Sequence, residues 1–254
     1  MITLENVSAV YAGSQKLALD GVNLHVPTHE TVTILGGSGA GKSTVLKAIL
    51  RLTPITSGRI LINGEDCSRM DPITLRRTIG MVFQGIGLFP HLTVRDNVGL
   101  VLKLAGSKPK LIRSRVEEVL QLVGLPAAEY AHRYPHQLSG GQQQRVGVAR
   151  ALAPSPSYLL MDEPFGALDA ITRRALQETV KELRQALSVT ILFVTHDVME
   201  AVSLGDQLAV MDQGRLLQVG KVRQLMDKPA SPAVEALVGR PLSELSSFVA
   251  ESIA

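Results

Sequence analysis

Continuous apolar runs alternate with helix-like segments along much of the chain. The runs cover residues 31–35, 158–161, 190–195 and 207–211, and none shows the alternation of a half-buried strand. Continuous runs of this length are typical of strands buried on both faces, as in parallel sheets covered by helices. Helix-like segments follow the first three runs, at 42–52, 170–187 and 197–203. The pattern therefore predicts an α/β sheet with crossover helices.

Two regions depart from this pattern. Near the N-terminus, Val22, Leu24 and Val26 alternate with polar residues, and Asn63-Gly64 follows another strand-like segment as a hairpin turn signal. From 93 to 153 only helical periodicity is present, as in the apolar positions of residues 116–123. We therefore expect an α/β core with a helical insert, rather than two tandem domains.

Composition narrows the class of protein. The 254 residues are 45% hydrophobic and 19% charged, which allows a substantial core and excludes a disordered or fibrous chain. Cys67 is the only cysteine, so an internal disulfide is excluded. The first residues lack the features of a secretory signal, and Pro90 interrupts the longest stretch without Asp, Glu, Lys or Arg. We therefore expect a soluble intracellular protein.

A glycine-rich motif lies between the first buried run and the helix-like segment after it. Gly36-Gly37-Ser38-Gly39-Ala40-Gly41-Lys42-Ser43 fits the phosphate-loop pattern G-x-x-x-x-G-K-[ST]. Glycines let successive N–H groups turn toward phosphate oxygens, and the helix start adds the positive end of its dipole. Lys42 is expected to reach the β- and γ-phosphates, and Ser43 to offer its hydroxyl to Mg²⁺. The motif predicts nucleotide binding; a chance glycine-rich turn is the alternative.

Two acidic residues follow the apolar run 158–161. Asp162 stands at the end of this predicted strand, where a carboxylate can reach Mg²⁺ directly or through water. Glu163 comes next, and its carboxylate can polarise an attacking water. A solvated strand end without a function is the alternative, and the phosphate-loop motif in the same chain makes it the weaker one.

A second anion-binding helix start is predicted at residues 138–142. In Leu138-Ser139-Gly140-Gly141-Gln142, Ser139 is a good N-cap and the glycines let phosphate approach the backbone. The pentapeptide resembles the signature motif of the ATP-binding cassette (ABC) ATPases. In that family two subunits associate head-to-tail, and the phosphate loop of one and the signature of the other enclose the same ATP. The resemblance therefore implies an ATPase whose complete site needs two copies.

The resemblance covers residues 1–227 and implies a fold. This is an α/β fold with a P-loop NTPase (RecA-like) core, an antiparallel β subdomain and an inserted α-helical subdomain. The implied ABC nucleotide-binding domain spans 1–227, with the catalytic core at 1–84 and 155–227 and the helical subdomain at 85–154. Residues 228–254 are expected to be a short C-terminal extension, either a dimer contact or a plain extension.

Family roles carry over to matching positions elsewhere in the chain. Tyr11 resembles the aromatic residue that stacks on adenine. Gln84 ends a predicted strand over residues 78–83 and resembles the loop glutamine that contacts Mg²⁺ and the lytic water. His196 resembles the switch histidine that bonds the γ-phosphate. Gly166-Ala167-Leu168-Asp169 resembles the loop that crosses the dimer interface, with Asp169 as its polar partner.

The motifs and the family resemblance together imply three sets of site residues. The implied catalytic residues are Glu163, His196, Gln84 and Lys42. The implied ATP contacts are Tyr11, Gly36, Gly37, Ser38, Gly39, Ala40, Gly41, Lys42, Ser43, Thr44, Leu138, Ser139, Gly140, Gly141, Gln142 and Asp169. The implied Mg²⁺ ligands are Ser43, Gln84 and Asp162.

A narrower resemblance concerns the solute. Residues 85–94, 134–137 and 166–173 resemble the ATPases of importers for osmoprotectants such as glycine betaine, choline and carnitine. Many of those ATPases continue into a pair of CBS domains, for which this chain is too short. The implied partners are a second copy or a similar ATPase, integral-membrane permease subunits and, indirectly, a substrate-binding protein. The implied location is the cytoplasmic face of the inner or cell membrane, as a peripheral subunit.

An uncharged cluster follows Gln84. Ile86, Leu88 and Phe89 have no charged neighbour, so they are either buried core or an exposed patch for a partner. In the ABC family a groove here receives a short helix of the membrane subunit. The resemblance therefore favours the exposed patch.

Other functions remain possible from the sequence. One is import of another small solute such as an amino acid. Another is a soluble ABC ATPase acting on nucleic acid, since residues 85–150 carry nine Lys or Arg and four Asp or Glu. Soluble ABC proteins of that class usually carry two cassettes or a long coiled coil, so no nucleic-acid partner is expected. A small-molecule P-loop kinase would leave residues 138–142 unexplained.

Overall fold

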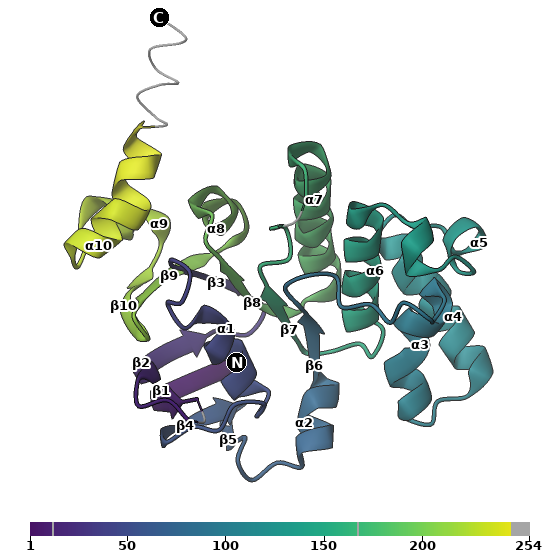
Figure 1. The fold of residues 1–254 in the computed structure, drawn as a ribbon, viewed down its shortest axis with the longest axis horizontal. Helices are drawn as coiled ribbons and strands as arrows, with labels where there is room; N and C mark the ends of the chain where they lie inside the picture. Colours follow the sequence, from purple (N-terminus) through teal and green to yellow (C-terminus); the bar gives the residue numbers. More distant parts are fainter. Residues whose placement is uncertain (12, 167, 245–254) are drawn as a thin grey trace, which may run out of the picture. The chain divides into compact units, whose positions relative to one another are not determined.

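The computed structural model describes residues 1–11, 13–166 and 168–244. It comprises two compact units, the first built from residues 1–70 together with those from 192 onward, and the second from residues 71–191 (Figure 1). The division falls within strand β8 (Thr190–Thr195), all of whose residues are buried. In this described part of the chain, no helix combines the length and apolar character needed to cross a membrane.

The first unit contains a four-stranded antiparallel sheet with the order β2-β1-β4-β5. Its strands are β1 (Ile2–Val10), β2 (Leu17–Val26), β4 (Ser57–Ile62) and β5 (Glu65–Asp66). Ile2 pairs with Val26 on one side and with Ile62 on the other, so these apolar residues share one buried face. The predicted Asn63-Gly64 turn joins β4 to β5, and both residues have positive φ, as a tight hairpin turn requires.

The first unit also contains parallel strands of the kind that the apolar runs predict. Its remaining elements up to residue 220 are β3 (Thr31–Leu35), α1 (Lys42–Ile49), α8 (Val198–Leu204), β9 (Gln207–Asp212) and β10 (Arg215–Gly220). β3 and β9 pair in parallel, and β10 returns antiparallel to β9. β3 is buried throughout and ends at Leu35. The glycine-rich motif therefore starts at the carboxyl end of a buried parallel strand, where α/β sheets place their ligands.

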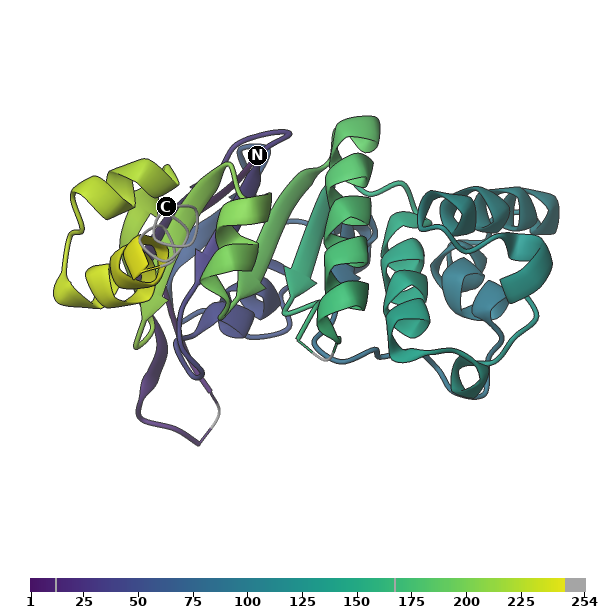
Figure 2. The same ribbon diagram turned by 90° about the horizontal axis from the view of Figure 1, so that it is seen from above.

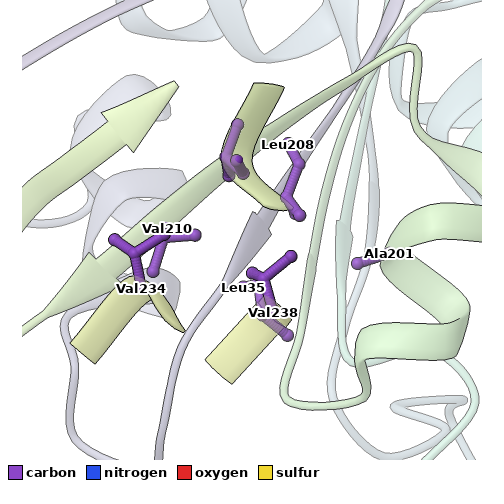
Figure 3. Close-up of a cluster of buried hydrophobic side chains, with 7 residues drawn as sticks. Leu35, Ala201, Leu208, Val210, Val234 and Val238 are labelled. Carbon is purple, nitrogen blue, oxygen red and sulfur yellow. The ribbon is translucent and has the colours of Figure 1, made fainter. Parts of the chain in front are cut away.

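Part of the described segment after Asp227, residues 228–244, packs into the core of this unit. It contains α10 (Pro232–Val234) and a π-helical turn (Glu235–Gly239), and it follows α9 (Val222–Asp227). Val234 and Val238 lie in one buried cluster with residues of β3, α8, β9 and α9 (Figure 3). The other members are Leu35, Ala201, Leu208, Val210 and Leu225. Since Leu35 directly precedes the glycine-rich motif, residues 228–244 support the strand that carries this motif.

The second unit joins two parallel strands to a group of helices. Its elements are α2 (Pro72–Thr78), β6 (Ile79–Val82), α3 (Val94–Leu104), α4 (Pro109–Leu122), α5 (Ala127–Tyr130), a 3-10 turn (Pro135–Gln137), α6 (Gly140–Leu152), β7 (Tyr158–Asp162) and α7 (Ala170–Leu187). β6 and β7 pair in parallel. Helices α3, α4 and α6 pack together (Figures 1 and 2). Residues 93–153 contain no strand, as their helical periodicity predicts.

Several element boundaries differ from the sequence prediction by one to three residues, and for two of them the local structure gives the reason. The strand before Gln84, expected over 78–83, is shorter at Ile79–Val82, because Thr78 closes α2 and its hydroxyl donates to Leu75 O at 2.7 Å. Helix α1, expected to reach residue 52, ends at Ile49, and Arg51 adopts a left-handed φ of 53° that no helix continues through.

Candidate nucleotide-binding site

The glycine-rich motif forms a tight loop between β3 and α1. Gly41 is the N-cap of α1 with φ 102°, and Gly39 has φ 77°, conformations that are strained for residues with a side chain. At Gly36 a Cβ would overlap the carbonyl oxygen of Met211 in β9. No atom approaches the Cβ position of Gly37 or Gly39. The loop therefore packs against β9 on one side and presents bare backbone at a helix start, a geometry that favours an anion.

Lys42 and Tyr11 contact this loop and its helix. Lys42 is only 5% exposed, and its Nζ donates to Gly36 O at 2.9 Å and to Gly37 O at 3.0 Å. Its charge is thereby held at the loop backbone. Tyr11 shares a hydrogen bond of 2.8 Å with Thr44 Oγ1 in the first turn of α1, while the residue is 44% exposed. An aromatic ring is therefore anchored beside the start of α1 and accessible to a ligand.

Gln84 and Glu163 meet in the second unit. Gln84 Nε2 donates to Glu163 Oε2 at 3.3 Å. Glu163 directly follows β7, and Gln84 comes two residues after β6, so the two paired parallel strands bring their carboxyl ends together. Asp162, the last residue of β7, is buried with 5% exposure. The amide and the two carboxylates predicted for Mg²⁺ and water therefore share one edge of this strand pair.

The backbone of Glu163 is unusual. Its φ of 43° lies in the left-handed region, which costs a residue with a Cβ roughly 1–2 kcal/mol. Gly166 N donates to Glu163 O at 3.3 Å and helps to close the turn. Strained residues of this kind concentrate at functional sites, where the surrounding structure holds them in place.

The signature residues start helix α6 in the way the sequence predicts. Ser139 is the N-cap, and its Oγ accepts from Gln142 N at 3.3 Å while Gln142 Oε1 accepts from Ser139 N at 2.9 Å, which completes a capping box. The two glycines differ. The space beside Gly140 is open, but a Cβ at Gly141 would overlap Thr172 Cγ2 in α7. Gly140 therefore exposes backbone to a ligand, whereas Gly141 lets two helix starts pack together.

Asp169 lies at the start of α7 and so near the signature. As N-cap of α7 it accepts from Ile171 N at 3.1 Å, Thr172 N at 3.0 Å and Thr172 Oγ1 at 2.7 Å. These hydrogen bonds from Thr172 stabilise the carboxylate and lower the pKa of Asp169. Thr172 thus uses its hydroxyl to hold Asp169 and its methyl group to contact Gly141. Ala167 of the same predicted loop lies outside the described residues.

His196 directly follows β8 and is exposed. The next residue, Asp197, caps α8 by accepting from Met199 N at 2.8 Å and Glu200 N at 3.3 Å. The imidazole therefore stands where a buried strand ends and a capped helix begins. The predicted site residues thus form two groups. The phosphate loop, Tyr11 and His196 belong to the first unit, and Gln84, the carboxylates, the signature and Asp169 to the second.

Comparison with known proteins identifies the family. The ABC transporter family model matches residues 19–166. The chain belongs to the ABC transporter family. The match includes the phosphate loop, the signature residues and the carboxylates, which are the motifs that predict the family from the sequence.

Two curated relatives of this ABC protein are named for the transport of choline and of glycine betaine. The choline transport ATP-binding protein OpuBA of Bacillus subtilis (strain 168) is 48% identical over 240 residues, covering 94% of this chain and 62% of the relative. The glycine betaine uptake system ATP-binding protein YehX of Escherichia coli (strain K12) is 45% identical, covering 94% and 77%. The narrower resemblance is therefore confirmed. The chain spans 62–64% of the length of the three curated relatives that share 46–48% identity with it.

A solved ABC structure confirms the fold class. The dimeric structure of a post-hydrolysis state of the ATP-binding cassette MJ0796, bound to ADP and Pi, has a TM-score of 0.78 at 36% identity. The match covers 87% of this chain and 98% of that one. The predicted P-loop fold, with its antiparallel β subdomain and its α-helical subdomain, is therefore correct.

The donors of this ABC chain suit Mg²⁺. Ser43, Gln84 and Asp162 offer hydroxyl, amide and carboxylate oxygens, the hard ligands that this ion prefers. Within the described ranges, no three His, Cys, Asp or Glu residues cluster so that they could hold a metal by themselves. Mg²⁺ commonly takes only one or two carboxylates and completes its coordination with phosphate and water. The buried carboxylate of Asp162 at a strand end fits such a site.

Two residues that the sequence motifs do not include hold the 85–92 loop, the segment after Gln84. Asn97 in α3 is fully buried, and its side chain accepts from Phe89 N at 2.8 Å. Its Nδ2 donates to three carbonyl oxygens, those of Phe89, Leu92 and Thr93, at 3.0–3.1 Å. Arg150 in α6 is 9% exposed, and its Nη1 donates to Gly87 O at 2.8 Å. Each is a polar residue on an apolar helix face, which is the signal that could have revealed it.

The uncharged cluster within this loop is not core. Phe89 is 43% exposed and Phe83, just before Gln84, is 45% exposed, while Ile86 and Leu88 are half-buried. The aromatic rings of Phe89 and His91 contact edge to face, with centroids 6.1 Å apart. Since Asn97 bonds both the N–H and the C=O of Phe89, the exposed ring stands on a fixed backbone.

Proposed function

We propose that the chain is the ATP-hydrolysing subunit of an ABC importer, working as a head-to-tail dimer that binds and hydrolyses ATP with Mg²⁺. One observation carries the proposal: a single chain holds both a phosphate loop and a separate, capped signature helix with bare backbone at Gly140. Each loop would then meet the signature of the other subunit. The similar cassette that was solved as a dimer bound to ADP and Pi supports the dimer.

Each group of site residues has a role in this proposal. Tyr11 would stack on adenine, and the loop 36–43 would cradle the phosphates with the charge of Lys42. Ser43, Gln84 and Asp162 would serve as ligands for Mg²⁺, and the charge of the ion would offset that of the phosphates. Glu163 would accept the proton of the attacking water, with Gln84 beside it. His196 would donate a hydrogen bond to the γ-phosphate, and Asp169 would fix its loop at the interface between subunits.

Glycine betaine, choline and related quaternary ammonium compounds are the proposed solutes. The support is the similarity to OpuBA and YehX, together with the motif at residues 85–94. The solute itself would bind to other subunits, a permease and a receptor protein. The subunit would accordingly lie at the cytoplasmic face of the membrane, held there by the permease.

Concentration dependence tests the dimer and the ATPase together. We expect the specific ATPase activity to rise steeply with protein concentration, because a monomer lacks the opposite signature. Sedimentation velocity should show a dimer with ATP and a monomer with ADP. A specific activity that stays constant over dilution, from a species that remains monomeric, would contradict the shared site. Salt-sensitive DNA binding would instead favour the nucleic-acid alternative.

The exposed ring of Phe89 is the proposed contact for the permease. Replacing it with alanine in the transporter reconstituted with its permease should lower solute uptake by roughly 30-fold, as loss of an aromatic hot spot does. ATP hydrolysis by the isolated subunit and its melting temperature should change little, because Phe89 is 43% exposed and its removal leaves no large cavity in the core. Leu52→Ala, at a residue 52% exposed in the first unit, is the matched control and should retain uptake. A large fall in melting temperature with uptake intact would show that Phe89 is a core residue.

A further inference from the structure

The 85–92 loop rests on the helix that begins with the signature. Arg150 Nη1 bonds Gly87 O, and its Nη2 lies 3.6 Å from the Cβ position of Gly87. Ile86 O lies 3.7 Å from the Cβ position of Gly147, one turn earlier on the same helix. Gly87 has a left-handed φ of 56°, so the backbone turns its carbonyl to the guanidinium with no side chain in the way. The loop after Gln84 therefore follows the surface of α6.

The C-terminal end of α6, where Arg150 lies, also packs against β6, the strand before Gln84. A Cβ at Gly80 in β6 would overlap Ala151 O, so helix and strand pack backbone against backbone. Gln84 thus lies between two attachments to α6, one at Gly80 on the strand and one at Gly87 on the loop. Its side chain bonds Glu163 at 3.3 Å. A movement of α6 therefore has to shift Gln84 or break one of these contacts.

The burial of Arg150 makes its hydrogen bond to Gly87 O costly to break. The residue is 9% exposed, and removal from water lowers the pKa of its guanidinium. A buried charged donor left without its acceptor is costly, so the bond to Gly87 O is expected to persist when α6 moves. Gly140 lies ten residues before Arg150, about 15 Å along the axis at 1.5 Å per residue. A short, continuous helix thus links the signature to the Gln84 loop.

We propose that Arg150 is a positioning residue through which ATP at the signature of this chain controls the Gln84–Glu163 pair of the same chain. The inference rests on the proposed function, in which that signature serves the partner subunit's ATP and Gln84–Glu163 serve the chain's own. Arg150 then links the two ATP sites of the dimer. ATP hydrolysis should be cooperative, and the cooperativity should depend on the bond between Arg150 and Gly87.

The test compares two arginines of α6. Arg145 Nη1 donates to Val123 O at 3.0 Å, a bond of the same kind that leads to the end of α4 and not to the 85–92 loop. We expect Arg150→Met to lower the Hill coefficient for ATP toward 1 and kcat by roughly 10–100-fold, as loss of a charged hydrogen bond allows. Binding of a slowly hydrolysed ATP analogue should stay within about threefold, because Arg150 does not belong to the phosphate loop. Arg145→Met should keep the wild-type Hill coefficient.

Two further measurements keep the test decisive. Arg150→Lys retains a donor and should restore part of the cooperativity, and it replaces the methionine variant if that protein does not fold. Amide hydrogen exchange over residues 85–89 should quicken in Arg150→Met and not in Arg145→Met. Equal Hill coefficients in wild type and Arg150→Met, equal losses in both methionine variants, or a wild-type Hill coefficient of 1 would each overturn the inference. Failure of the wild type to dimerise or hydrolyse ATP would instead refute the proposed function.

Discussion

Replacing Glu163 with glutamine should slow ATP hydrolysis by roughly 10²–10⁴-fold while ATP binding stays intact. The amide keeps the size of the carboxylate and can still bond Gln84, 3.3 Å away, but it cannot take a proton from water. The backbone at residue 163 has a left-handed φ of 43°. Glutamine and glutamate have the same Cβ, so this conformation should cost both residues about the same. The substitution should therefore slow the chemical step of hydrolysis and leave ATP binding unchanged.

The variant should also trap the dimer. Because dissociation follows hydrolysis in the proposed cycle, Glu163→Gln with ATP should sediment as a dimer for far longer than the wild type does. Single-turnover rates and sedimentation velocity measure the two effects. Glu178→Gln, an exposed carboxylate in α7, is the control and should behave as the wild type. Turnover near the wild-type rate in Glu163→Gln would remove this residue from the role of base.

Replacing Gly141 with alanine should destabilise the protein by roughly 1–3 kcal/mol, the usual cost of overpacking. The added Cβ would overlap Thr172 Cγ2, so the starts of α6 and α7 would have to separate. ATPase activity should fall as well, because this separation moves both the signature and the turn that Asp169 caps. Chemical denaturation measures the first effect and steady-state hydrolysis the second.

A second substitution can relieve the overlap. Thr172→Ser removes the methyl group and keeps the hydroxyl that donates to Asp169 Oδ2, so Gly141→Ala with Thr172→Ser should regain most of the lost stability. Gly140→Ala is the contrasting variant. It adds a Cβ in open space and should leave the free energy of unfolding nearly unchanged while reducing hydrolysis. If Gly141→Ala is as stable as the wild type, the two helix starts are not packed as tightly as the structure has them.

Much of the site could be predicted because its motifs are local. The phosphate loop needs a strand end, glycines with positive φ and a helix start within a few residues, and all three are visible as residue types in order. The capping box of Ser139 and Gln142 spans only three residues. The continuous apolar runs also located β3 and β8 to the residue, because strands buried on both faces need apolar side chains at nearly every position.

Contacts between distant segments could not be predicted. The contact of Gly141 with Thr172 and the hydrogen bond of Arg150 to Gly87 are two examples. The sequence does not indicate either partner, because a glycine or a buried arginine can pack against many kinds of residue. The packing of Val234 and Val238 on Leu35 is of the same kind, because their apolar character predicts burial but not the strand that covers them. The left-handed backbone at Glu163 is a further example, since glutamate rarely adopts it.

The sequence by itself determined the family, the order of strands and helices and the identity of the chemical groups. It could do so because hydrophobic periodicity, helix caps and phosphate-binding glycines each involve residues that lie close together in the sequence. Only the tertiary structure decided what each group contacts: that Gln84 bonds Glu163, that Asn97 and Arg150 hold the exposed loop, and that Gly141 serves packing while Gly140 stays open. These contacts depend on how helices and strands pack against one another. The packing is determined by the shapes of segments that lie far apart in the chain.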